Sequence, residues 1–238
     1  MKAQLLSGLQ QLNLSLSETQ VEAFERYSQE LMSWNQRVNL TGIVEPTEIA
    51  IKHFLDSISV CQALQNIPPF FSMIDIGSGA GFPGLPLKIV YPEIQLTLLE
   101  SVIKKTAFLQ HVIHVLNLTN VTILTARAEE AGHLTDHRER YDVAVARAVA
   151  KLPTLAEYSL PLVKVGGWVI VQKGQNPSAE VAEAAKALKT LGGQLCQILP
   201  ITVPGLEAAR HLITIQKRKP TPKQYPRRPG LPLKKPII

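Results

Sequence analysis

The residues best suited to bind a ligand are closely spaced glycines in the first half of the chain. Gly77, Gly79 and Gly81 follow an apolar run, Ser72–Ile76, and precede a segment with helical spacing, Leu85–Val90. Glycine allows tight turns and lets a ligand approach the backbone. Open α/β sheets bind ligands where a strand passes into a helix. These glycines therefore predict a loop that holds a cofactor.

Two cofactors fit the spacing of these glycines. Gly79-x-Gly81-x-x-Gly84 matches the pattern in which a pyrophosphate sits on a helix N-terminus, which is typical of an NAD-dependent oxidoreductase. Alternatively, Asp75-x-Gly77-x-Gly79-x-Gly81 looks like the S-adenosylmethionine loop of Rossmann-like methyltransferases. The acid at position 75 and a pair of strand-like runs near the C-terminus favour S-adenosylmethionine.

Glu100 is a second candidate for cofactor binding, because it closes the next apolar run, Ile94–Leu99. A carboxylate at the end of the second strand can accept hydrogen bonds from the ribose hydroxyls of either cofactor. Glu100 therefore locates the predicted site without deciding which cofactor it takes. For Asp75 we expect one of two roles: shaping the glycine loop or bonding the cofactor.

The order of apolar and helical segments predicts the fold that positions these groups. Strands are expected at Ser72–Ile76, Ile94–Leu99, Val121–Leu124, Asp142–Ala146 and Trp168–Gln172. Helices are expected between them, at Leu85–Val90, Ile103–Leu116, Leu155–Val163 and Ala179–Leu191. This alternation predicts an α/β, Rossmann-like fold with a parallel sheet covered on both sides. Gln194–Val203 and His211–Lys217 predict an antiparallel hairpin at one edge.

The first part of the chain has a helical pattern. Ser17 and Gln20 have capping-box spacing, which predicts the start of a helix, and a second helix is expected at roughly Thr47–Leu64. Pro68-Pro69 marks a boundary. We therefore predict a helical extension over 1–67, a cofactor-binding domain over 68–217 and a tail over 218–238.

Composition excludes several classes of protein. Two cysteines, Cys61 and Cys196, do not make a disulfide framework, so a reducing compartment is expected. Apolar runs are too short to span a membrane, and the N-terminus lacks a signal-peptide core. The histidines lack metal-ligand spacing, so no metal is expected. These features predict a cytoplasmic protein.

Several motifs together make the sequence similar to one known family. They are Trp34-Asn35, Asn39-Leu40-Thr41, Lys52-His53-Phe54-x-Asp56-Ser57, Asp75-Ile76-Gly77-Ser78-Gly79-Ala80-Gly81-Phe82-Pro83-Gly84, Arg127-Ala128-Glu129-Glu130 and Arg147-Ala148. The chain resembles, over nearly its whole length, the bacterial 16S rRNA guanine-N7 methyltransferases of the ribosomal RNA small subunit methyltransferase G family, also called glucose-inhibited division protein B. The Gly-Phe-Pro-Gly segment and the Arg-Ala pair are far more specific than the glycines alone.

The resemblance implies a cofactor, a substrate and a set of site residues. The cofactor is S-adenosylmethionine; the substrate is one guanine of 16S rRNA, as free RNA, in an assembly intermediate or in the small ribosomal subunit. No membrane contact and no obligate protein partner are expected. Taken with the loop residues above, the candidate cofactor-binding residues are Asp75, Gly77, Gly79, Gly81, Phe82, Glu100, Ser101, Val102, Ala128, Glu129 and Arg147.

The implied reaction requires positioning rather than proton transfer. Guanine N7 has a lone pair in the ring plane and no proton, so it can attack the sulfonium methyl directly, without a general base. Accordingly, no catalytic acid or base is predicted. Arg147 interrupts an apolar strand at its carboxyl end, where it could pair with the methionine carboxylate or an RNA phosphate. A non-catalytic RNA-binding assembly factor with the same fold remains an alternative.

Charge predicts where RNA binds. The chain has 25 Lys and Arg against 19 Asp and Glu, a net charge of +6. Eight of the basic residues and none of the acidic ones lie in Lys217–Ile238, so the other 216 residues have 17 basic and 19 acidic groups. Six prolines in this segment favour an extended arm whose removal leaves cofactor binding intact. The candidate RNA-contact residues are Lys217, Arg218, Lys219, Lys223, Tyr225, Arg227, Arg228, Lys234 and Lys235.

Overall fold

A computed structural model describes residues 1–65, 71–174 and 177–238. Seven strands in this part of the chain form one sheet in the order β3-β2-β1-β4-β5-β7-β6. The strands are β1 (Ser72–Ile76), β2 (Gln95–Glu100), β3 (Val121–Thr125), β4 (Tyr141–Arg147), β5 (Val163–Lys173), β6 (Gly193–Ile201) and β7 (Arg210–Lys217). The first five are parallel, whereas β7 is antiparallel to both β5 and β6. The predicted α/β sheet and its edge hairpin are confirmed.

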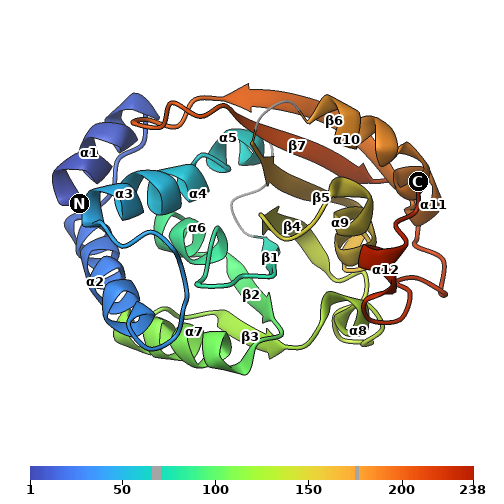
Figure 1. The fold of residues 1–238 in the computed structure, drawn as a ribbon, viewed down its shortest axis with the longest axis horizontal. Coiled ribbons are helices and arrows are strands. Elements are labelled where there is room, and N and C mark those ends of the chain that lie inside the picture. The colour runs from blue at the N-terminus through green and yellow to red at the C-terminus, as the bar shows by residue number, and fades with distance from the viewer. Residues whose placement is uncertain (66–70, 175–176) are drawn as a thin grey trace.

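Helices lie on both sides of this sheet (Figure 1). The helical segments before the sheet are α1 (Lys2–Gln11), α2 (Glu18–Asn35), α3 (Pro46–Ile49), the π-helix η1 (Ala50–Leu55), α4 (Asp56–Ile58) and α5 (Cys61–Leu64). The later helices are α6 (Gly84–Val90), α7 (Ile103–Val115), α8 (Ala128–Ala131), α9 (Leu152–Ser159), α10 (Ser178–Glu183), α11 (Ala185–Leu191) and α12 (Leu231–Lys234). In Figure 1, α1 to α7 cover one side, and α8 to α11 cover the other.

Three helix predictions need correction in detail. The helix expected at Leu155–Val163 begins at Leu152, because a proline in its first turn favours a helix start, and it ends before Val163, which opens β5. The helix expected at Ala179–Leu191 is divided into α10 and α11. The helix expected at Thr47–Leu64 is a continuous series from α3 to α5 with a π-helical part, η1. The predicted boundary at Pro68-Pro69 lies outside the described residues.

The first helices share a hydrophobic core with the sheet. Successive side chains of a strand point to opposite faces, so Met73 packs in one apolar cluster, while Ile74 and Ile76 pack in another. The cluster with Met73 also contains Leu5 of α1 and Phe24 of α2. The capping box predicted at the start of α2 is present and directs this helix onto the sheet. The helical extension therefore packs directly against one face of the sheet.

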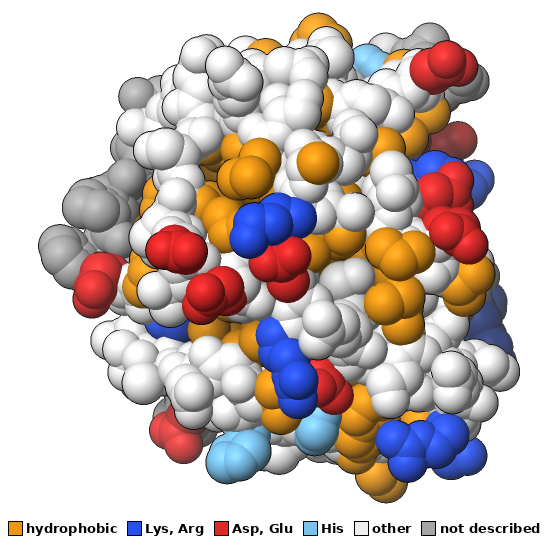
Figure 2. Space-filling view, turned by 90° about the vertical axis from the view of Figure 1, so that its left-hand side faces the viewer, with side chains coloured by type: hydrophobic (Ala, Val, Ile, Leu, Met, Phe, Trp, Pro, Cys, Tyr) orange, Lys and Arg blue, Asp and Glu red, His pale blue; other side chains and the backbone are white. Residues whose placement is uncertain are grey.

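The side of the molecule formed by α1 and α2 is electrically mixed. Figure 2 shows Lys and Arg side chains interspersed with Asp and Glu, and hydrophobic patches broken up by polar atoms. Ion pairs such as Lys2–Glu25 and Arg26–Glu30 contribute to this pattern. Unlike the C-terminal segment, this side presents no uniform positive charge among the residues described. No helix in the described ranges is long and apolar enough to cross a membrane.

The C-terminal segment is docked on the protein, so the expectation of an extended arm is wrong. The Arg138 guanidinium donates to the carbonyls of Tyr225 and Thr221, at 2.8 and 2.9 Å. The Thr154 hydroxyl of α9 donates to the carbonyl of Pro232 at 3.1 Å. These donors satisfy tail carbonyls that an extended arm would expose to water. The segment consequently lies against α8 and α9.

Two of the predicted RNA-contact residues are used inside the protein. Lys217 is fully buried in β7, with its ammonium 3.1 Å from Glu139. Arg227 pairs with the fully buried carboxylate of Glu157 at 2.7 Å. Both charges are paired with these internal acids; the Lys217 side chain is enclosed, whereas that of Arg227 is 24% exposed. Tyr225 is half-buried, and the exposed members of the predicted set are Arg218, Lys219, Lys223, Arg228, Lys234 and Lys235.

The Arg227–Glu157 pair makes a stability prediction. Removing one member of a buried ion pair leaves the other charge without compensation, so Arg227→Ala is expected to lower the free energy of unfolding by about 3 kcal/mol. The adjacent, exposed Arg228 is the matched control, and Arg228→Ala is expected to change it by less than about 0.5 kcal/mol. Urea denaturation of both variants checks this, and equal effects would contradict the docked arrangement.

Candidate functional site

The glycine loop connects β1 to α6 through backbone conformations that favour glycine. Gly77, Gly79 and Gly81 have φ angles of +68°, +59° and +96°. The Gly77 amide donates to the Leu99 carbonyl at 2.8 Å, which ties the loop to the end of β2. A Cβ at position 79 would meet only open space beyond the Gly77 carbonyl at 3.9 Å. The glycine sequence thus produces a tight loop with accessible backbone at the carboxyl end of the sheet.

Asp75 supports the loop from within the core. Its side chain is fully buried, and its Oδ2 accepts a hydrogen bond from the Gly84 amide at 2.9 Å. Burial raises the pKa of this carboxyl to about 7, although the Gly84 hydrogen bond and the Arg147 charge oppose the shift. Of the two roles expected for Asp75, this geometry favours shaping the loop.

Glu100 links the loop to the segment after β2. Its Oε2 accepts from the Gly79 amide at 2.9 Å, and its Oε1 accepts from the Val102 amide at 2.8 Å. The carboxylate is thereby held in one orientation at the end of the strand. Each carboxylate oxygen has a second lone pair, so Glu100 can still accept from a pair of ribose hydroxyls.

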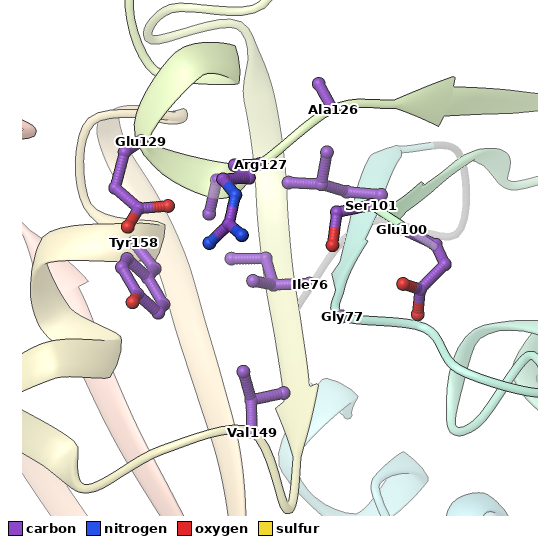
Figure 3. Close-up of a pocket in the computed structure, with 11 residues that line it drawn as sticks. Ile76, Gly77, Glu100, Ser101, Ala126, Arg127, Glu129, Val149 and Tyr158 are labelled. Carbon is purple, nitrogen blue, oxygen red and sulfur yellow. The ribbon is translucent and has the colours of Figure 1, made fainter. Parts of the chain in front are cut away.

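A pocket opens beside this loop where β1, β2 and β3 end (Figure 3). Figure 3 shows Glu100 and Ser101 on one side of it and Glu129 and Tyr158 on the other, with the side chain of Arg127 between them. The lining residues are Ile76, Gly77, Leu99, Glu100, Ser101, Ala126, Arg127, Ala128, Glu129, Val149 and Tyr158. Acidic groups, a hydroxyl and apolar surface in one pocket suit the ribose and adenine of a nucleoside cofactor.

The far wall of the pocket depends on Glu129. This residue is 3% exposed, and its Oε1 accepts from the Gly230 amide of the C-terminal segment at 2.8 Å. Burial and the neighbouring Glu129 carboxylate raise the pKa of Tyr158 to about 12, so its hydroxyl stays protonated. Together these contacts fix one side of the pocket against the docked tail.

A second, more basic pocket adjoins the first where β4 ends. Arg147 belongs to this pocket and Val149 to the first, and Ala148 between them has a left-handed φ of +56°. The reversal at Ala148 directs its two neighbours into different pockets. A non-glycine residue in this conformation is sterically costly and is often found at functional sites. The second pocket is lined by Lys52, His53, Asp56, Arg147, Ala148, Gln172, Lys173, Gly174 and Arg210.

Asp56 is central to the second pocket. Its Oδ2 accepts from Arg147 at 2.7 Å, and its Oδ1 accepts from Arg210 at 3.0 Å. Asp56 is 3% exposed, and its backbone carbonyl also accepts from Gln172 at 2.7 Å. One carboxylate from the helical extension therefore positions two arginines from β4 and β7.

The structure separates the predicted cofactor residues into four groups. Gly77, Glu100, Ser101, Ala128 and Glu129 line the first pocket. Gly79 and Val102 contact Glu100, whereas Asp75, Gly81 and Phe82 are buried outside the pocket wall. Arg147 lies in the second pocket. The Phe82 ring packs against Tyr27 and His53, and cofactor contact by this residue stays a prediction.

Other pocket residues were not among the candidates. Arg127 and Tyr158 line the first pocket, and Lys52, Asp56 and Arg210 line the second. The motif Arg127-Ala128-Glu129-Glu130, which follows the third strand, was a usable signal for Arg127. No comparable signal pointed to Tyr158 or Arg210, because only the folded chain brings them to the site. The described residues contain no group of three or more side chains suited to hold a metal ion.

The strand order, the glycine loop and the acid that closes β2 define a Rossmann-like α/β protein with a cofactor site at the carboxyl edge of its sheet. The same fold occurs in M. jannaschii TYW2 in complex with AdoMet, with a TM-score of 0.53, 15% identity and coverage of 69% of this chain and 77% of that one. It also occurs in a SAM-dependent methyltransferase from Aquifex aeolicus, with a TM-score of 0.52, 14% identity and coverage of 73% and 94%. At these identities the similarity shows the fold alone.

Sequence comparison identifies the family. The model of the family described as rRNA small subunit methyltransferase G matches residues 20–213. A relative of that name from Roseiflexus castenholzii is 52% identical over 225 residues, covering 94% of this chain and 95% of the relative. Another, from Desulforamulus reducens, is 46% identical over 233 residues, covering 98% and 97%. The chain belongs to this family, as its motifs indicated.

Family membership decides between the cofactors that the glycine spacing left open. The protein is an S-adenosylmethionine-dependent methyltransferase, and the predicted cofactor is confirmed. The first pocket fits this cofactor, because the Gly77 backbone lines it together with the carboxylates of Glu100 and Glu129. The NAD-dependent oxidoreductase is not supported.

The buried carboxyl of Asp75 makes a pH prediction. Its pKa rises from 3.8 to about 7 on folding, so the unfolded chain ionises first and stability falls as pH rises through this window. Asp75→Asn keeps an acceptor for the Gly84 amide but does not ionise. The unfolding free energy of the wild type minus that of Asp75→Asn is expected to fall between about pH 4 and pH 7 and to stay constant above it. Chemical denaturation across this range measures the difference, and a flat profile would contradict the buried state.

The Gly230–Glu129 contact makes a prediction about cofactor affinity, and it revises the expectation that tail removal leaves cofactor binding intact. Deleting residues 229–238 removes a hydrogen bond to a buried carboxylate, so the Kd for S-adenosylmethionine is expected to rise about tenfold. Calorimetric titration measures it. The control is Lys234→Gln/Lys235→Gln, which neutralises exposed charge without removing the contact. Unchanged affinity in the deletion would show that the tail does not support the pocket.

Proposed function

We propose that this protein transfers the methyl group of S-adenosylmethionine to N7 of a specific guanine in 16S rRNA. The observation that supports this most is the direct junction, at Ala148, of a pocket suited to the cofactor and a basic pocket suited to RNA. Relatives over nearly the whole length of the chain are named ribosomal RNA small subunit methyltransferase G. An enzyme with this substrate acts in the cytoplasm, where ribosomes are found.

In the first pocket, five of the predicted residues would hold the cofactor. The Gly77 backbone would hold the methionine end of the molecule, and the Glu100 carboxylate would accept hydrogen bonds from the ribose hydroxyls. Ser101, Ala128 and Glu129 surround the adenine. Arg127 also lines this pocket, and its side chain projects between the two walls in Figure 3.

The second pocket receives the target nucleotide. Lys52, Arg147, Lys173 and Arg210 line it, against the single acid Asp56. Lys173 is paired with Glu180 and Lys52 with Glu48, and the two arginines share Asp56. Each guanidinium has five N–H donors, more than its internal contacts use, so the arginines keep donors for RNA oxygens. Guanidinium groups present several donors in a fixed plane and are well suited to phosphate and base oxygens. A base entering this pocket approaches the cofactor at the end of β4.

The chemistry needs no proton acceptor. Guanine N7 attacks the methyl carbon in line as the sulfur–carbon bond breaks, which leaves S-adenosylhomocysteine and a methylated guanine with a positive charge. No proton leaves in this step. The second pocket is consistent with a step that needs no base. Burial and the Arg147 charge lower the pKa of His53 to about 3, and both of its ring nitrogens are already in hydrogen bonds. Rate enhancement then comes from orientation of the base against the methyl group.

The exposed part of the tail extends the RNA surface. Arg218, Lys219, Lys223 and Arg228 are exposed, as are Lys234 and Lys235. The segment begins beside Gly193, where β7 ends, and reaches the cofactor pocket at Gly230, which donates to Glu129. Docking holds its backbone in place, which lowers the entropy cost of binding a phosphate backbone.

Transfer of a labelled methyl group tests the proposed function. The protein is incubated with labelled S-adenosylmethionine and 16S rRNA, either free or in the small subunit, and mass mapping locates the modified base. Label at a single N7-methylguanine is the expected result. Label on another atom would contradict the N7 assignment. No transfer to any of these substrates would favour the alternative of a non-catalytic RNA-binding assembly factor.

The tail makes a separate RNA-binding prediction. Changing its six exposed basic residues to Gln is expected to weaken RNA binding and to reduce the slope of log K against log salt by up to about 4, since each phosphate contact on a single strand contributes about 0.7. Affinity for S-adenosylmethionine is expected to stay as in the wild type, because Gly230 and Arg227 keep their contacts. Filter binding at several salt concentrations gives the slope. An unchanged slope would exclude the tail from the RNA interface.

A further inference from the structure

His53 is a buried polar residue to which the reaction assigns no chemistry. It lies in the π-helical segment η1, its side chain is 9% exposed, and it lines the basic pocket. Its ring is stacked on Phe82, with centroids 4.4 Å apart and an interplanar angle of 13°. π-helical turns within helices are frequent at functional sites. The location of His53 therefore suggests that it has a function beyond packing.

The neighbours of His53 define its tautomer. Arg147 lies with its Nη2 3.3 Å from Nδ1, and a guanidinium can only donate, so Nδ1 is the acceptor. The proton of the neutral ring is then on Nε2, which donates to the Thr41 hydroxyl at 2.7 Å. That hydroxyl also accepts from the Ile43 amide at 3.0 Å. Thr41 thus fixes the tautomer that His53 needs in order to accept from Arg147.

Arg147 has three of its five N–H groups occupied in this arrangement. Nη1 donates to the Lys52 carbonyl at 3.1 Å and to Asp56 at 2.7 Å, and Nη2 donates to His53. The guanidinium also lies over the Phe82 ring at 5.1 Å. Within the described residues, the Nε–H and one Nη2–H have no hydrogen-bond partner. These two donors are the ones left for a ligand in the pocket.

We propose that His53 is a positioning residue that orients Arg147 toward the RNA substrate. As an acceptor on Nη2, it fixes the rotation of the guanidinium plane, which Asp56 and the Lys52 carbonyl, both bonded to Nη1, leave less constrained. The oriented Arg147 then presents its two remaining donors to oxygen atoms of the RNA. This inference rests on the proposed RNA substrate, and it assigns His53 no contact with the reacting atoms.

Two near-isosteric variants separate this role from simple packing. Asn places its amide oxygen close to the position of Nδ1 and keeps an acceptor for Arg147. Gln reaches toward Nε2 and keeps a partner for Thr41, but it leaves Arg147 without its acceptor. Gln fills the volume of His better than Asn does. A packing role therefore predicts that Gln is tolerated better, and a positioning role predicts that Asn is.

The test is the steady-state kinetics of methyl transfer to 16S rRNA by the full chain. His53→Gln is expected to raise the KM for RNA about tenfold, and His53→Asn by no more than about threefold, with the Kd for S-adenosylmethionine within twofold of the wild type in both. Thr41→Val is expected to raise the KM for RNA, and Thr41→Ser, which keeps the hydroxyl, is expected to raise it less. Thermal unfolding establishes that each variant is folded.

Several outcomes would overturn the inference. They are a greater loss in His53→Asn than in His53→Gln, equal loss in both, or a matching loss of S-adenosylmethionine affinity. Should His53→Gln fail to fold, the comparison of Thr41→Val with Thr41→Ser decides, and equal KM values there would count against positioning. The wild-type assay tests the proposed function separately. Absence of RNA methylation by the wild type would refute the proposed RNA substrate, whereas the order of KM values among the variants tests the positioning role of His53.

Discussion

The arrangement of the site depends on one buried carboxylate. Asp56 comes from the helical extension, yet it pairs with Arg147 at the end of β4 and Arg210 at the start of β7. Two guanidinium groups this close together would repel each other without a shared anion, and Asp56 without them would be an uncompensated buried charge. Removing Asp56, Arg147 or Arg210 therefore leaves the remaining charges less well compensated. This mutual requirement joins the first helices to the carboxyl edge of the parallel strands.

The same interaction explains why the fold was easier to predict than the site. Strand positions follow from local apolar runs, and the glycine loop follows from spacing within a few residues, so both were predictable. The second pocket joins Asp56, Arg147 and Arg210, which are separated by 91 and 154 residues in the pairings with Asp56. No periodicity encodes such distances. Resemblance to the family drew attention to Asp56 and Arg147 as motif residues, but their contact emerges only from the folded chain.

The distribution of charge identified the C-terminal segment as basic, but it led to a wrong prediction of the conformation of that segment. Basic residues and prolines together suggested an extended arm, since neither favours a packed core. The docking partners are donors and acids elsewhere in the chain: Arg138 for the tail carbonyls, Glu139 for Lys217 and Glu157 for Arg227. In the residue composition, these acids are simply part of residues 1–216, which have a slight excess of acidic groups. It does not show that two of them face the basic segment.

The docked tail has a consequence for how this protein changes over evolution. Arg227 and Arg228 are adjacent and chemically identical, but one is fixed by an internal acid and the other faces solvent. Selection on RNA affinity acts on positions such as 228 and can proceed by single substitutions. Position 227 is constrained together with Glu157, so a viable change there requires a matched change in α9. Neighbouring residues of one basic segment are thus expected to drift at different rates, according to the partner each one has.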